Sequence, residues 1–262
     1  PDDTTLIEYF STQEEVLCFV ISRVSAKVFR RLSPPTRIRS IQERLAFQLE
    51  KFLLGPDYVE AHSGQILEAA RHYLEACYGL LFKPFDSEIQ TKRVTIVPHG
   101  QLHALPFHAF YDGSQYLIDR FEFSYAPSAS VLRYCQEKPD IEGAPPLILG
   151  VADELAPMVD EEVRALGEVF PAARRLSGEA ATRQAFSDAV QEASFVHVAT
   201  HAIFRRDNPM FSSFKLSDGY MTALDLFSMN CQTNLVTLSS CNRSEEHTSE
   251  LQSRFGISYA VF

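Results

Sequence analysis

The chain has 262 residues, of which 45% are hydrophobic, and it carries a formal net charge of −10. A chain of this length and composition can bury one large hydrophobic core or two smaller ones, so it is globular and not disordered. The acidic balance, with a sequence pI of about 5.3, argues against nucleic-acid binding, which requires a basic surface that neutralises phosphates.

The cysteines indicate a reducing, cytoplasmic compartment. They are odd in number and widely spread, and no two of them have CxxC spacing, so neither a disulfide framework nor a zinc site is predicted. They are Cys18, Cys77, Cys135, Cys231 and Cys241. No run approaches the ~18 apolar residues that span a bilayer, and the first residues lack the pattern of a signal peptide. We therefore expect no membrane partner.

The first 90 residues contain two kinds of pattern. Strand-like runs separated by short polar breaks predict an antiparallel β-meander over residues 1–35. These runs lie at 6–10, 16–21 and 26–32. After the tandem prolines at 34–35, apolar residues at helical spacing predict two helices, at 36–52 and at 65–81. We assign residues 36–90 to a helical segment.

Residues 91–242 have the pattern of an α/β domain. Short apolar runs alternate there with helical stretches, at 94–97, 147–151, 195–199 and 235–238. Unbroken apolar strands that alternate with helices predict a mostly parallel sheet with helices on both faces. Ligands bind such sheets at the carboxyl ends of the strands, so the residues that follow each strand are the candidates for function.

Two of these strand ends carry the residues of a cysteine-nucleophile dyad. His201 follows the run at 195–199, and Cys241 follows the run at 235–238. If these strands are neighbours, the imidazole can remove the proton from a thiol whose ordinary pKa is about 8.5. Caspases have the same order, with His before Cys. The alternative is that both are ordinary core residues. We assign His197, inside its strand, to packing or a buried hydrogen bond.

Six stretches of the chain, in this order, resemble the CHAT family of caspase-like cysteine peptidases, bacterial relatives of caspases and separase that are often fused to tetratricopeptide repeats. The resemblance covers about 90–242. The matching stretches are VTIVPHGQLHALPFHAF at 94–110, YLIDR at 116–120, SYAPSAS at 124–130, HVATH at 197–201, DNPMFSS at 207–213 and LSSC at 238–241. The resemblance implies a caspase-like fold for residues 91–242.

The resemblance also implies a mechanism. His201 is then the general base and Cys241 the nucleophile of peptide-bond hydrolysis, and the backbone N–H groups of Cys241 and Ala202 hold the oxyanion. The family usually has Gly in place of Ala202, and Gly allows a closer approach of the substrate. The implied protein needs no cofactor, acts on a protein or peptide in bacterial signalling or regulated proteolysis, and has a tetratricopeptide-repeat or other sensor domain upstream. The alternative is a non-catalytic caspase-like interaction module.

Four further residues are candidates for supporting the site. By the resemblance, His99 and Gly100 belong to a loop after the first strand of the sheet that shapes the rim of the active site. Asp207 and Asn208 belong to the loop after the catalytic histidine. Asp-Asn-Pro favours a turn, so we expect this pair to position His201 through turn and hydrogen-bonding contacts.

The histidines near residue 100 allow a second interpretation, a metal site. His99 and His103 are four residues apart and would share one face of a helix. However, Pro98 and Gly100 favour a turn, and no third ligand lies at a matching spacing. We therefore predict no metal.

The last twenty residues break the α/β pattern. Residues 243–253 and 257–262 resemble a translated sequencing adapter, so we expect natural sequence to stop near Asn242. The alternative is a genuine, divergent helix. On the adapter interpretation the chain is a fragment that lacks the C-terminal part of the sheet and much of the substrate pocket. We then expect an open sheet edge beside the strand at 235–238, and an inactive chain despite its catalytic pair.

Overall fold

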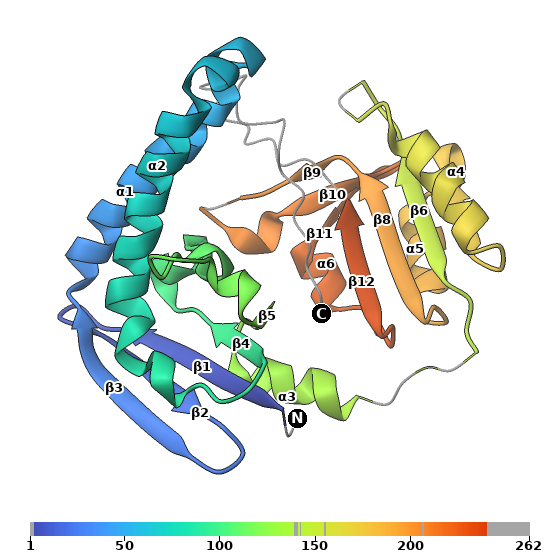
Figure 1. Ribbon diagram of the computed structural model, residues 1–262. Coiled ribbons are helices and arrows are strands. Elements are labelled where there is room, and N and C mark those ends of the chain that lie inside the picture. The colour runs from blue at the N-terminus through green and yellow to red at the C-terminus, as the bar shows by residue number, and fades with distance from the viewer. Residues whose placement is uncertain (1–2, 139–140, 142, 155, 206, 240–262) are drawn as a thin grey trace. The chain divides into compact units, whose positions relative to one another are not determined.

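The computed structural model describes residues 3–138, 141, 143–154, 156–205 and 207–239 (Figure 1). The chain divides into two compact units, Pro1–Glu137 and Lys138–Phe262. This division differs from the expected boundaries after residues 35 and 90, because strands that we assigned to the α/β core pair with the N-terminal meander. The expected boundary after residue 242 lies outside the described residues.

The first unit is built on a five-stranded sheet with the order β3-β2-β1-β4-β5. The predicted meander is confirmed, since its three strands pair antiparallel. Strand β4 pairs parallel with β1 and with β5, so the run at 94–97 belongs to this sheet. The expectation that this run belongs to the parallel sheet of the α/β domain is therefore wrong. The strands are β1 (Thr4–Ser11), β2 (Val16–Ile21), β3 (Ala26–Ser33), β4 (Arg93–Val97) and β5 (Glu122–Tyr125).

Two long helices follow the meander and pack against each other, α1 (Pro35–Glu50) and α2 (Pro56–Leu81) (Figure 1). Helix α2 begins nine residues earlier than predicted, because Pro56 suits the first turn of a helix. Gly55, with φ of 105°, separates it from the short helix η1 (Lys51–Leu54). The core beneath is rich in fully buried aromatic rings, namely Tyr9, Phe82, Phe85, Phe107 and Phe110.

The rest of the first unit consists of short elements, and the 3₁₀ helices among them contribute buried residues to this core. The short elements are η2 (Lys83–Glu88), η3 (Gly100–Ala104), η4 (Phe107–Ala109), η5 (Leu117–Asp119) and α3 (Ala129–Glu137). Within the described part of the chain, no helix is both long and apolar enough to cross a membrane.

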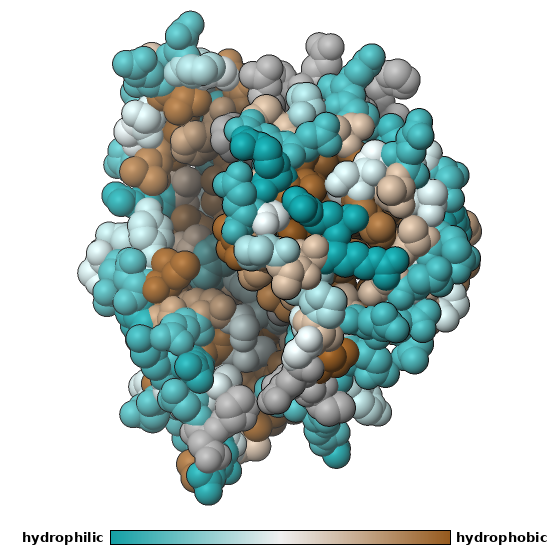
Figure 2. Space-filling view, turned by 90° about the vertical axis from the view of Figure 1, so that its right-hand side faces the viewer, coloured by the Kyte–Doolittle hydropathy of each residue, from teal (hydrophilic) through white to brown (hydrophobic). Residues whose placement is uncertain are grey.

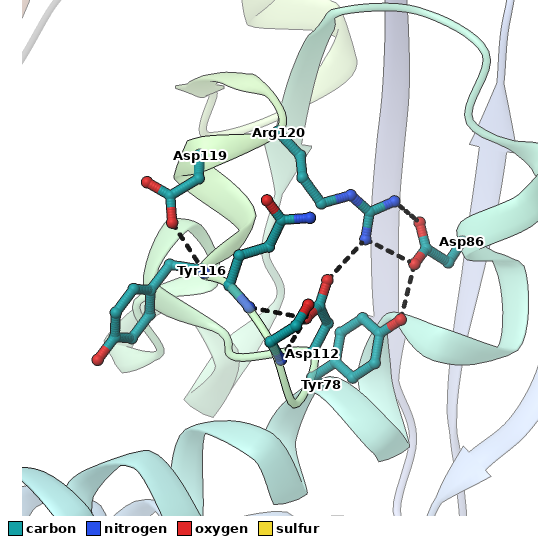
Figure 3. Close-up of polar contacts among 8 residues, drawn as sticks. Tyr78, Asp86, Asp112, Tyr116, Asp119 and Arg120 are labelled. Atoms are coloured by element: carbon teal, nitrogen blue, oxygen red, sulfur yellow. Dashed lines mark hydrogen bonds and ion pairs between the residues drawn. The ribbon is translucent and has the colours of Figure 1, made fainter.

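A polar network ties η2, η5 and the loop around Asp112 to α2 and explains the YLIDR stretch (Figure 3). Arg120 donates to both carboxylate oxygens of Asp86, at 2.7 and 2.9 Å, and lies 3.4 Å from the Asp112 carboxylate. Tyr78 donates its hydroxyl hydrogen to Asp86 at 2.7 Å. Burial alone would raise the pKa of Asp112. Hydrogen bonds from Gln115 and Ser114 outweigh this effect and lower the pKa of Asp112 to about 2. The motif therefore fastens loops to α2.

The second unit is the predicted α/β domain. Its four strands are all parallel, in the order β12-β8-β6-β7. They are β6 (Leu147–Val151), β7 (Arg174–Ser177), β8 (Phe195–Thr200) and β12 (Leu235–Ser239), and the helices that contact the sheet are α4 (Val159–Val169) and α5 (Arg183–Val190). Alternate residues of β6 pack in two separate cores, Ile148 with α4 and Leu149 with α5, so the helices cover opposite faces (Figure 1). The α/β fold class is confirmed.

Helix α4 packs unusually close to the sheet. A Cβ atom at Gly150 would lie 2.3 Å from Val163 Cγ2 and 3.1 Å from Val159 Cγ1, so only glycine fits on this face of β6. The side of the unit that carries α4 is mostly hydrophilic towards solvent (Figure 2).

A small antiparallel sheet with the order β11-β10-β9 lies between β8 and β12 in the chain. It comprises β9 (Ala202–Ile203), β10 (Ser213–Leu216) and β11 (Gly219–Thr222), and α6 (Ala223–Phe227) follows it. Two short turns complete the unit, η6 (Gly178–Ala180) and η7 (Pro209–Phe211).

Candidate active site

The chain order of the strands across the main sheet of the second unit locates the site. Strand β6 comes first in the chain and β7 second, on one side of it, whereas β8 and β12 follow on the other side. The direction of strand addition therefore reverses between β6 and β8, and ligands of open α/β sheets bind at the carboxyl ends of such strands. His201 follows β8 directly at this edge and is 6% exposed.

The register of β8 and β12 is the geometric basis for the candidate dyad. The two strands pair over their full common length, and the last pair is Ala199 with Ser239. His201 lies two residues after Ala199 in the chain, and Cys241 lies two residues after Ser239. Cys241 itself lies outside the described residues. The sequence expectation that the two strands are neighbours is confirmed.

Hydrogen bonds on both sides hold the backbone at His201. The Lys215 amide donates to the His201 carbonyl oxygen at 2.8 Å. The Thr200 hydroxyl donates to the Lys215 carbonyl oxygen at 2.9 Å and lies 3.4 Å from the carbonyl oxygen of Val151. The histidine thus leaves the main sheet at a point fixed to both β6 and β10.

Ala202, which the sequence resemblance implies as an oxyanion donor, lies in the first position of β9. It pairs with Phe214, and the bond from Lys215 to His201 identifies this as a non-hydrogen-bonded pair of the antiparallel ladder. The Ala202 amide therefore points away from β10 and takes no part in that ladder. Ala202 is not among the described residues with positive φ, so its conformation does not require the glycine that is usual in the family.

An ion pair that we did not predict lies near the same edge. Asp153, two residues after β6, accepts a hydrogen bond from Lys215 Nζ at 2.9 Å. This bond with Asp153 raises the pKa of Lys215. A polar residue directly after an apolar strand is the signal that could have identified Asp153. Lys215 has no comparable signal, because its place depends on the β10 pairing.

Asp207 and Asn208 organise the loop between β9 and β10. Both carboxylate oxygens of Asp207 accept hydrogen bonds from Arg205, at 3.0 and 2.8 Å, and this pairing lowers the pKa of Asp207 to about 2. The Asn208 carbonyl oxygen accepts from the Phe211 amide at 3.0 Å, which closes the turn at Pro209. Their expected effect on His201 stays a prediction.

His99 and Gly100 belong to the first unit. The Ser11 amide donates to His99 Nδ1 at 3.2 Å, and the ring of Phe10 stacks on His99 with a centroid distance of 4.7 Å. Gly100 has a φ of 57° and begins η3. These contacts hold the loop against β1, whereas His201 belongs to the second unit. Among the described residues, no three His, Cys, Asp or Glu side chains form a group that could hold a metal.

His197 is buried, and its hydrogen bonds, which are partly buried, belong to a larger network than we expected. Its Nε2 lies 2.9 Å from Glu162 Oε1, and its Nδ1 lies 2.6 Å from the Thr237 hydroxyl. The other carboxylate oxygen of Glu162 accepts from the Ser239 hydroxyl at 3.1 Å. The network thus joins α4, β8 and β12 immediately before the candidate dyad. Glu162 has no signal in the sequence beyond its place in the first turn of α4.

Comparison with known families matches residues 71–262 to the CHAT domain. The match covers well over half of the chain and includes all of the second unit. No curated protein matches the chain.

Proposed function

Because the chain belongs to the CHAT domain family, whose fold is that of caspase-like cysteine peptidases, we propose that its second unit hydrolyses peptide bonds with Cys241 as nucleophile and His201 as base. The observation that supports this most strongly is the register of β8 and β12. On this proposal the ladder continues for two residues, which makes Cys241 the partner of His201 at the carboxyl edge.

The reaction would proceed in two steps. The imidazole of His201 takes the thiol proton, and the Cys241 sulfur attacks the carbonyl carbon of the scissile bond. The tetrahedral oxyanion collapses, the C–N bond breaks, and His201 returns the proton to the leaving amine. Water then attacks the thioester, with His201 as base, and the C–S bond breaks to give a carboxylic acid and the free thiol.

The backbone around the dyad supports this chemistry. An oxyanion hole needs N–H groups that are not already used in a ladder, and the Ala202 amide faces away from β10. Together with the Cys241 amide, it would supply the two donors. Asp207 and Asn208, which set the shape of the following loop, would position His201 from outside. We further propose a protein substrate and a bacterial signalling role under the control of an upstream sensor domain.

The test is to express the full-length protein with a candidate partner protein, with and without Cys241→Ala, and to look for cleavage of either protein. We expect processing in the parent and in Cys231→Ala, a matched cysteine in the same unit. Processing should be lost in Cys241→Ala. Processing that persists in Cys241→Ala would refute the peptidase and favour the non-catalytic interaction module.

A further inference from the structure

We infer that Glu162 and His197 are positioning residues, which fix the register of β12 against β8 and thereby set the approach of Cys241 to His201. This inference rests on the proposed function. It concerns four polar side chains that come from three elements: Glu162 on α4, His197 on β8, and Thr237 and Ser239 on β12.

The network is partly buried and each bond has a defined partner. His197 is 9% exposed. A carboxylate can only accept, so His197 Nε2 carries a proton that it donates to Glu162, and in the neutral ring Nδ1 accepts from Thr237. The two carboxylate oxygens of Glu162 then accept hydrogen bonds from different strands. One binds His197 of β8 and the other binds Ser239 of β12.

The apolar faces of the strands do not define this register by themselves. On the α5 side, Val196 and Val198 of β8 pack with Val236 and Leu238 of β12 in one core. A shift of β12 by two residues would keep the same set of side chains on that face, because side chains alternate with a period of two, and one valine of β8 would still lie opposite Val236 or Leu238. It would also move Cys241 by about 6.6 Å along the strand, beyond hydrogen-bonding reach of His201. Directional polar contacts on the other face distinguish the two registers further, because the shift would separate His197 from Thr237.

The position of Glu162 in the first turn of α4 offers a simpler explanation, since acidic side chains there stabilise the helix dipole. Asp160 and Glu161 already occupy that turn, however. Glu161 lies 3.9 Å from Arg164 of its own helix and is largely exposed. Glu162 instead turns towards the sheet. The contrast between these adjacent glutamates provides the matched control.

The test uses the full-length protein. It measures how the rate of Cys241 alkylation by iodoacetamide depends on pH. Peptide mass spectrometry distinguishes Cys241 from the other cysteines. Alkylation reports the thiolate, and a thiol that has lost its imidazole partner returns towards a pKa of about 8.5. The exposed Cys135 serves as an internal reference. The variants are Glu162→Gln, which loses the charge and one of the two acceptor oxygens of the carboxylate, and Thr237→Val, which suits a strand but lacks the hydroxyl. Glu161→Gln is the control.

We expect the midpoint for Cys241 to rise by about one pH unit in Glu162→Gln and in Thr237→Val, a tenfold loss of thiolate near neutral pH. Glu161→Gln and the Cys135 profile should not change. Glu162→Gln should lower kcat about tenfold with KM within twofold, because a small misplacement of reacting groups acts on the chemical step. A variant that lost only stability would show none of these shifts at temperatures where it remains folded.

Two results are decisive. If Glu162→Gln and Thr237→Val both give the parental midpoint for Cys241, the positioning role is wrong even though the dyad stands. If His201→Ala gives the parental midpoint, the dyad itself is refuted and this inference with it. The His201→Ala arm thus distinguishes failure of the proposed function from failure of the inference.

Discussion

Ala199 of β8 and Ser239 of β12 are partners in the parallel ladder of the second unit. Each lies two residues before a member of the proposed dyad, His201 or Cys241. Because a parallel ladder keeps its register as it continues, this pair is the structural link between the strand order and the proposed chemistry.

Removal of the proposed base should abolish cleavage without unfolding the protein. We expect His201→Ala to lower the rate of peptide-bond cleavage by about 10²–10⁴-fold, the usual contribution of a general base. The backbone bond from Lys215 to residue 201 does not depend on the side chain, so the local fold should remain. Cleavage of the partner protein, measured by gel densitometry, is compared with His72→Ala, which removes an exposed imidazole from α2. Equal rates in the two variants would contradict the assignment.

The Ala202 amide can be tested by removing its hydrogen. Ala202→Pro eliminates the N–H while the ladder with β10 remains, since this amide faces away from β10. We expect kcat to fall by about 10²–10³-fold, as for the loss of one oxyanion donor. Ala202→Gly keeps the N–H and should retain the parental kcat to within a few fold. A proline variant with parental kcat would show that the amide is not part of the hole.

The close contact of α4 with β6 predicts opposite effects for two glycine substitutions. Gly150→Ala places a methyl group 2.3 Å from Val163, so we expect the free energy of unfolding to fall by about 1–3 kcal/mol. Gly64→Ala, in the interior of α2 with open space around its Cβ, should raise it by about 0.5–1 kcal/mol. Denaturant titration followed by circular dichroism measures both. An unaffected Gly150→Ala would mean that α4 is not held as described.

The lowered pKa of Asp112 predicts an acid-dependent contribution to stability. This carboxyl has a pKa of about 2 in the folded protein, against about 3.9 for an ordinary aspartate. The stabilisation is therefore fully present above about pH 4 and is lost as the pH falls through 2. The difference in unfolding free energy between the parent and Asp112→Asn should be largest near neutral pH and shrink between pH 4 and pH 2.

The control for this pH dependence is Asp188→Asn, which replaces an exposed carboxylate on α5. The difference in unfolding free energy between the parent and Asp188→Asn should not follow the pH profile expected for Asp112→Asn. Urea unfolding at a series of pH values gives the comparison. A difference between the parent and Asp112→Asn that is constant from pH 7 to pH 2 would be incompatible with the hydrogen bonds from Ser114 and Gln115.

Local pattern was sufficient to predict the elements of the second unit. The apolar runs at 147–151, 195–199 and 235–238 coincide with β6, β8 and β12 to within one residue. Their spacing by helices gave the parallel pairing, because only a crossover connection of this length can join parallel neighbours. The strand-end position of His201 followed from the same argument.

Long-range pairing explains what the sequence did not predict. The run at 94–97 looks like any buried parallel strand, yet it pairs with β1, and the paired residues Leu6 and Thr95 are 89 positions apart in the chain. Nothing local to it distinguishes that partner from β6. For the same reason no local pattern indicates that Glu162 reaches His197, since the contact depends on how α4 crosses the sheet.

The most direct test of Cys241 as the nucleophile is to trap the acyl-enzyme. The full-length protein is quenched with acid while it cleaves its partner, and the peptide that contains Cys241 is examined by mass spectrometry. We expect a fragment of the cleaved partner joined to the Cys241 sulfur as a thioester that hydroxylamine removes. The adduct should be absent from Cys241→Ala, which should also show no cleavage. Cleavage that proceeds in Cys241→Ala, with no adduct on this peptide in the parent, would contradict it.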